Sequence, residues 1–213
     1  MTPPSRASLR SRRLFVLVTI LPLFASACLV TPGGPHVEAV AAPGFDPTSI
    51  SKLAVTIGRS SQLTANSDLG RRLEDQVVQV LLTKGYTIAA RSDVEPLLKE
   101  LKFQHSGTTD ADAAKLGRML NVPVILLVTL YSVETHRAST LIQTNPPMNE
   151  TSATVGARMI SVERGEMLWT GTGSARYLVG REHASEVALA AARELALSVP
   201  GKLSGVASPK RYP

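Results

Sequence analysis

The chain has 213 residues, of which 44% are hydrophobic and 19% charged, and its formal net charge is +6. This composition is ordinary for a globular protein and excludes a wholly disordered chain or a fibrous repeat. Aromatic residues make up only 4%, which argues against base-stacking nucleic-acid modules, and a single cysteine excludes an intrachain disulfide or a cysteine-based metal cluster.

The first 27 residues have the pattern of a secretory signal peptide. Four arginines precede an apolar run over residues 14–24, and small residues follow it up to Ala27. A transmembrane helix is the alternative, but Pro22 interrupts a run that is at the lower limit for crossing a bilayer. We therefore expect residues 1–27 to be removed on secretion.

The single cysteine stands directly after these small residues. The sequence Ala25-Ser26-Ala27-Cys28 resembles a bacterial lipobox, in which cleavage between Ala27 and Cys28 leaves the cysteine acylated, for example with palmitate. The alternative is plain cleavage followed by a chance cysteine, but an unused thiol is a liability in an oxidising compartment. Cleavage leaves 19 basic against 17 acidic residues, so net charge gives no support for nucleic-acid binding.

The rest of the chain divides into a tether, one domain and a tail. Residues 28–50 are rich in proline and glycine without apolar periodicity, which predicts a flexible tether with His36 as a solvated loop residue. Residues 51–199 are expected to form the folded domain. Residues 200–213 carry no pattern of a helix or strand and are expected to be disordered.

Hydrophobic periodicity predicts the element order β-α-β-α-α-β-β-β-α within that domain. The strands are expected over residues 52–57, 86–90, 123–131, 152–162 and 167–173. The helices are expected from Asp68 to Lys84, after Ser92, after Thr109 and over residues 182–199. A tight turn at 163–166 joins the last two strands, and a loop is expected at 135–150. This order predicts a single α/β domain with a mixed sheet and packed helices.

Residues of the types that carry catalysis or bind metals do not converge in the sequence. The four histidines are far apart, and no Gly-x-Ser-x-Gly motif is present. Gly171-x-Gly173 follows a strand, but it lacks the third glycine and the Lys-Ser/Thr pair of a phosphate-binding loop. We therefore expect no enzyme activity, no metal, no cofactor and no small-molecule substrate.

Four stretches, taken in order, resemble the curli secretion channel (CsgG) family and its non-channel, LpoB-like relatives. They are residues 52–57, residues 91–101, residues 114–120, and residues 159–162 with 165–169. One departure is Asn121-Val122-Pro123, which stands where the family often has Gly-Ala-Asp. The resemblance implies a lipoprotein of the outer membrane whose α/β domain faces the periplasm.

Two functions fit these patterns. The first is a non-enzymatic lipoprotein, anchored through Cys28, that acts by protein–protein contacts in envelope biogenesis or secretion, with an envelope protein or a second copy as partner. Its candidate contact residues are Tyr131 and Trp169, because an aromatic can anchor a partner, and burial in the core is the other expectation for Trp169. The alternative is a subunit of an oligomeric CsgG-type secretion channel. The windows 135–150 and 174–181, where a channel subunit would extend membrane-crossing hairpins, are too short for two strands of about 9–11 residues each.

Overall fold

The computed structural model describes residues 34–58, 67–100, 109–137, 149–178 and 183–202. All of these residues belong to one compact unit, Thr31–Pro213. The predicted signal peptide, its cleavage site at Ala27 and the lipidation site at Cys28 lie outside the described residues.

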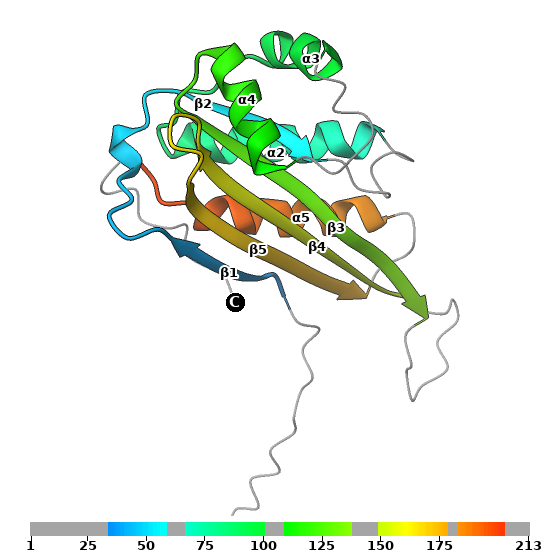
Figure 1. The fold of residues 1–213 in the computed structure, drawn as a ribbon. Helices are drawn as coiled ribbons and strands as arrows, with labels where there is room; N and C mark the ends of the chain where they lie inside the picture. Colours follow the sequence, from blue (N-terminus) through cyan, green and yellow to red (C-terminus); the bar gives the residue numbers. More distant parts are fainter. Residues whose placement is uncertain (1–33, 59–66, 101–108, 138–148, 179–182, 203–213) are drawn as a thin grey trace, which may run out of the picture. The chain divides into compact units, whose positions relative to one another are not determined.

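Five strands form one mixed sheet in the order β1-β5-β4-β3-β2 (Figure 1). Only β2 and β3 are parallel, and the other neighbours are antiparallel. The strands are β1 (His36–Ala41), β2 (Leu53–Gly58), β3 (Val124–Arg137), β4 (Asn149–Ser161) and β5 (Met167–Leu178). The prediction of a single α/β domain with a mixed sheet and packed helices is confirmed.

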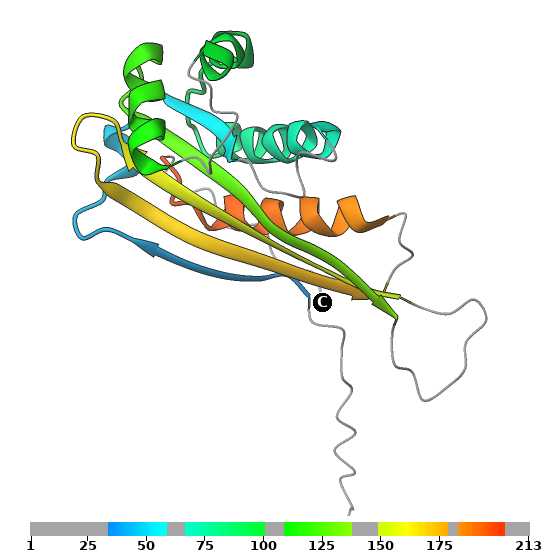
Figure 2. The same cartoon turned by 45° about the vertical axis from the view of Figure 1, so that its right-hand side comes forward.

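Four α-helices cover the sheet unevenly. They are α2 (Ser67–Thr83), α3 (Arg91–Glu100), α4 (Asp110–Leu120) and α5 (Ala184–Ser198), and a short 3-10 helix, η1 (Pro47–Ser49), precedes β2. Helices α2 and α5 lie on one face of the sheet (Figure 2), over a core that includes Leu126, Met159 and Trp169. Helix α4 lies on the other face, over a smaller core around Ile125 and Ile160, and α3 packs beside it. The second face is therefore only partly covered.

Local signals placed several of these boundaries correctly. Thr109 caps α4 in a capping box with Asp112, whose side chain accepts from the Thr109 backbone N–H. Gly85, at φ +85°, follows the end of α2, and Gly165, at φ +67°, lies in the turn between β4 and β5. Positive φ values favour glycine, which is why these two glycines marked the end of a helix and a turn in the sequence.

The predicted tether is wrong in its extent. Residues His36–Ala41 form β1, which pairs with β5 from Ser174 to Trp169, so His36 is an exposed strand residue rather than part of a loop. The folded part of the chain thus begins about fifteen residues before the predicted start at 51. Strand β1 lies at the sheet edge and five of its six side chains are exposed, so its sequence carries no pattern of a buried strand.

The predicted strand at 86–90 and the predicted loop at 135–150 are also corrected by the strand pairing in the structure. Residues 86–90 form no strand of the sheet, since Ile88 makes only an isolated bridge to Leu53. Strands β3 and β5 run on to Arg137 and Leu178, and β4 begins at Asn149. The predicted loop at 135–150 is therefore wrong at both of its ends, and the chain between β3 and β4 that lies outside the described residues is 138–148.

The chain just beyond α5 is held by a clasp of three side chains, Lys84, Tyr86 and Lys202. The Lys84 Nζ donates to the carbonyls of Leu197 and Val199 at 2.8 and 2.7 Å. The Tyr86 hydroxyl donates to the Pro200 carbonyl at 2.6 Å, and Lys202 Nζ donates to the Ile50 carbonyl at 2.6 Å. The predicted disordered tail is therefore wrong for residues 200–202, because these side chains fix their backbone.

We expect Tyr86 to make the stability of the protein fall between pH 10 and pH 12. Burial raises the pKa of Tyr86 from 10.0 to about 12. Because the folded pKa lies above the unfolded one, the contribution of the phenol is intact below pH 10 and is lost as the pH rises through the folded pKa. Tyr86→Phe should cost about 1 kcal/mol at pH 8, through the lost hydrogen bond. Urea unfolding from pH 8 to pH 11 should show this gap closing, and a constant gap would contradict the assignment.

Candidate interaction face

Helix α4 covers only part of its side of the sheet. We call the uncovered part of that side the open face. On β4 the buried residues Ala153, Val155, Ala157 and Met159 alternate with residues that point the other way, as a strand requires. Directly paired residues of neighbouring strands share a face, so the register defines its members. They are His36, Glu38 and Val40; Thr129, Tyr131, Ser132, Glu134 and His136; Glu150, Ser152, Thr154, Gly156 and Arg158; and Thr170, Thr172, Ser174, Arg176 and Leu178.

Tyr131 is the most prominent aromatic side chain of the open face. It occupies a β-bulge, since the register between β3 and β4 shifts between Leu130 and Ser132. Its ring lies on the backbone of Gly156, where an added Cβ would overlap the ring carbons and the hydroxyl oxygen. Tyr131 is still 55% exposed. The glycine thus makes room for an aromatic ring that lies against the sheet and keeps much of its surface in water.

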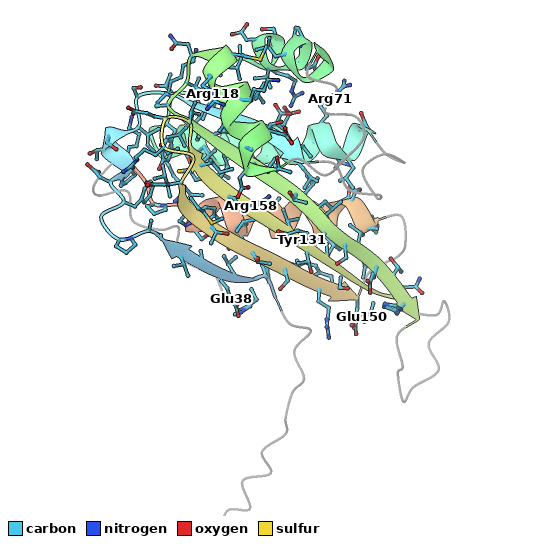
Figure 3. All side chains as sticks on the ribbon, in the orientation of Figure 1. Glu38, Arg71, Arg118, Tyr131, Glu150 and Arg158 are labelled. Carbon is cyan, nitrogen blue, oxygen red and sulfur yellow. The ribbon has the colours of Figure 1, made fainter. Side chains whose placement is uncertain are left out.

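The two arginines of the open face are each paired with a carboxylate of the same chain. Arg158 Nη1 lies 2.8 Å from Asp110 Oδ1 at the start of α4, and Arg176 Nε lies 3.3 Å from Glu150 Oε1. Figure 3 labels Arg158, Glu150 and Tyr131 on the sheet. The imidazoles of His36 and His136 each lie near a glutamate two residues away, at 3.4 and 3.2 Å. Pairs this exposed contribute little to stability. The result is a polar surface without a strong charge of one sign.

Exposed apolar side chains gather on this same side of the sheet. Val40, at 69% exposed, and Leu178 belong to the open face, as does Tyr131. Met167 is also exposed and is paired with Ile160, whose side chain lies beneath α4 on that side. In the described part of the chain the other large exposed apolar residues are Leu82 on α2 and Met119 on α4. Exposed apolar side chains that gather on one face are the kind of surface that contacts another molecule.

The structure separates the two predicted contact residues. Trp169 is 2% exposed and lies in the core on the opposite face, with its ring against Gly171. It presents no surface to a partner in the folded chain, whereas Tyr131 does. The contact role of each stays a prediction. Gly156, which seats Tyr131, was not singled out from the sequence, although an isolated glycine within a strand pattern signals a close approach of this kind.

The two glycines of Gly171-x-Gly173 have a packing role. A Cβ at Gly173 would lie 2.7 Å from the backbone oxygen of Ala191 and 3.0 Å from the Leu195 Cβ. A Cβ at Gly171 would lie 2.9 Å from Leu195 Cδ1. The glycines therefore let α5 approach β5 closely through its small buried side chains, Ala188, Ala191, Ala192 and Ala196.

Glu74 and Arg91, whose pKa values are shifted, lie at a contact between two helices. Burial raises the pKa of Glu74 on α2, and the nearby Arg91 guanidinium, with Nε 3.0 Å from Glu74 Oε1, opposes that shift. Arg91 also contacts Asp75 at 2.6 Å and so ties the start of α3 to α2. The described residues contain no group of three or more His, Cys, Asp or Glu that could hold a metal ion. None of the helices in the described ranges has the length and apolar character needed to cross a membrane.

Comparisons with solved structures return proteins of low sequence identity. A PelC dodecamer subunit from Paraburkholderia phytofirmans is 16% identical, with a TM-score of 0.47 over 76% of this chain and 94% of that one. The lipoprotein GNA1162 from Neisseria meningitidis is 16% identical, with a TM-score of 0.44 over 64% and 91%. The LpoB C-terminal domain from Salmonella enterica is 15% identical, with a TM-score of 0.38 over 59% and 82%.

A comparison with models of protein families gives a match over most of the folded domain. No curated protein sequence matches the chain. The model of the family described as curli production assembly/transport component CsgG matches residues 38–194, which run from β1 into α5. That match includes all four stretches in which the resemblance was seen. The chain belongs to the CsgG family.

Proposed function

We propose that this protein is a non-enzymatic lipoprotein of the outer membrane that acts from its periplasmic side by protein–protein contact. Cys28 carries the lipid after cleavage behind Ala27, and the folded domain meets a partner that takes part in envelope assembly or secretion. The family of curli production assembly/transport components, to which the chain belongs, supports this class of role.

The observation that carries the proposal is the open face with Tyr131. An aromatic ring that lies on Gly156 and keeps 55% of its surface exposed is the kind of side chain that anchors a protein contact. The arginines around it, Arg158 and Arg176, are already paired with carboxylates, so a partner can cover them without leaving a lone buried cation.

A photocrosslinking amino acid placed at Tyr131 tests this proposal in the full-length, lipidated protein. We expect a discrete crosslinked species from position 131, because its side chain lies at the centre of the proposed contact. The matched control is the same amino acid at Leu82, an equally exposed apolar residue on α2, away from the open face. Equal yields from the two positions, or a yield only from position 82, would contradict the use of the open face.

A second candidate is a subunit of an oligomeric secretion channel, which the family description favours. The chain available for membrane-crossing hairpins is short, since β3 and β5 already use residues up to Arg137 and Leu178. Residues 138–148 and 179–182 are left, against two strands of about 9–11 residues for each hairpin. Light scattering of the detergent-extracted protein separates the candidates: a large closed ring that conducts ions supports the channel, and a monomer or dimer supports the contact lipoprotein.

A further inference from the structure

Strand β1 forms one edge of the sheet, and no strand of the described residues pairs with its outer side. Figures 1 and 2 both show β1 at the outside of the sheet, with no helix beyond it. Edge strands are commonly protected from further pairing by a proline, a lysine or a bulge. Residues 36–41 contain neither proline nor lysine, and their pairing with β5 has no register shift. The edge is therefore regular enough to accept another strand.

The backbone groups of β1 divide between its two sides. The Ala42 N–H donates to the Leu168 carbonyl at 2.8 Å, one step beyond the end of the β1–β5 register. Hydrogen-bonded pairs alternate along an antiparallel ladder, so the alternate residues that begin with His36 also turn their N–H and C=O groups toward β5. The remaining residues of β1 turn these groups outward, where no described residue bonds them, and they are Val37, Ala39 and Ala41.

The prolines on either side of β1 select one register for pairing with a second copy of this strand. Antiparallel pairing has to place the outward residues of one copy opposite those of the other. With Ala39 opposite the partner subunit's Ala39, Val37 faces the partner subunit's Ala41, and every outward N–H meets a carbonyl. Moving the centre by one or two residues toward either end sets an outward residue against Pro35 or Pro43, which have no N–H.

The same register keeps the carboxylates of β1 apart. The side chain of Glu38 is 83% exposed, and in this register it faces Val40 of the partner subunit. Val40 is itself 69% exposed, so the pairing covers an apolar side chain. A register centred on Glu38 would instead place two carboxylates directly opposite each other, which is unfavourable. The positions of the two prolines and of Glu38 thus match β1 to itself.

We infer that β1 pairs with β1 of a second copy about a two-fold axis at Ala39, which joins the two domains through one continuous sheet. The second copy is the occupant of this edge, because the strand is complementary to itself in one register, as a two-fold contact requires. The inference goes beyond the proposed function, since it needs neither a lipid on Cys28 nor a partner at Tyr131.

The rest of the fold leaves room for this pairing. Helix α5 packs over β4 and β5, so the α5 helices of the two copies would lie roughly 20 Å apart, farther than packed helices do. Directly paired residues share a face, so both open faces would lie on the same side of the joined sheet. Gly156 pairs with Thr172, and Thr172 pairs with Glu38. The two Tyr131 rings would therefore lie about 25 Å apart on one surface.

Disulfide trapping tests the register in the full-length protein, purified in detergent. Glu38 and Val40 of the partner subunit would form a non-hydrogen-bonded pair, in which the Cα atoms lie about 4.5 Å apart, within reach of a disulfide. Glu38→Cys and Val40→Cys proteins are oxidised separately and as a mixture. We expect the mixture to give several-fold more linked dimer than either protein alone, because neither position faces itself. The protein without an added cysteine measures any link through Cys28.

Two substitutions at Ala39, each built into both cysteine proteins, test the backbone pairing. Ala39→Pro removes an outward N–H and leaves the donors of the ladder to β5 in place, so it should reduce the linked dimer to the level of the separate proteins. Ala39→Val keeps the N–H and should leave the linked dimer unchanged. Urea unfolding checks that both variants are folded, and the mixing experiment decides alone if Ala39→Pro is not.

Equal linking in the mixture and in the separate proteins would overturn the inference, and so would a link that survives Ala39→Pro in the folded protein. Neither result bears on the proposed function, which is tested separately by the crosslink from position 131.

Discussion

Replacing Gly173 by alanine is expected to lower the free energy of unfolding by about 2 kcal/mol. The new Cβ would lie 2.7 Å from the backbone oxygen of Ala191 and 3.0 Å from the Leu195 Cβ. Backbone atoms of a packed helix cannot rotate away as the tip of a side chain can, so α5 must move off β5. That shift loosens the contacts of its buried residues, among them Ala188 and Ala192. The stiffer unfolded chain of the alanine variant offsets the loss only partly.

Gly156→Ala is the matched control, since Gly156 lies on the adjacent strand β4. The three atoms nearest to its Cβ would all belong to the ring end of Tyr131, an exposed side chain that can turn toward solvent. We expect a change within about 0.5 kcal/mol in that variant. Urea unfolding of both variants gives the comparison. Equal midpoints would show that the approach of α5 to β5 does not limit stability, and that the glycines are there for another reason.

Helices were predicted well where their signals are local. Thr109 and Asp112 form their capping box within four residues, and Gly85 ends α2 with a positive φ that few other residues adopt. Neither feature depends on distant parts of the chain. The continuous apolar run at the start of β3 likewise predicted a strand buried on both faces. The structure confirms it, since Leu126 lies in one core and Ile125 in the other.

Strands were predicted poorly where their pairing partner decides their extent. Strand β1 has exposed side chains at five of its six positions, and only its ladder with β5 makes it a strand. Residues 86–90 have a strand-like sequence, yet Tyr86 is buried through its contact with Pro200, more than a hundred residues away. Hydrophobic periodicity within a short window cannot contain such long-range pairings.

The sequence predicted candidate residues for the site but not the face of the sheet on which each lies. Aromatic content pointed to both Tyr131 and Trp169, but it could not say which face of the sheet each would occupy. The bulge after Leu130 turns Tyr131 onto the open face, and the register of β5 places Trp169 beneath α5. A shift of one residue in either strand would exchange buried and exposed positions. Register, which a single sequence does not reveal, therefore decided which aromatic residue a partner can reach.

Replacing Lys84 by methionine is expected to destabilise the protein by about 2 kcal/mol. The ammonium group donates to the carbonyls of Leu197 and Val199, at 2.8 and 2.7 Å, where the last turn of α5 has no intrahelical donors left. Methionine keeps the length of the side chain but offers no donor and no charge. Burial lowers the pKa of Lys84, which shows that the ammonium gives up part of its hydration to make these bonds.

Lys115→Met on the exposed side of α4 is the control for the loss of a positive charge alone, and we expect it to change the stability by less than about 0.5 kcal/mol. Thermal and urea unfolding measure both variants. Hydrogen exchange adds a local readout, because the amides at the end of α5 should exchange faster in Lys84→Met while those of α4 stay protected. If both lysine variants unfold alike, the clasp follows the packing of α5 rather than stabilising it, and the fixed position of residues 200–202 must then come from Tyr86 and Lys202.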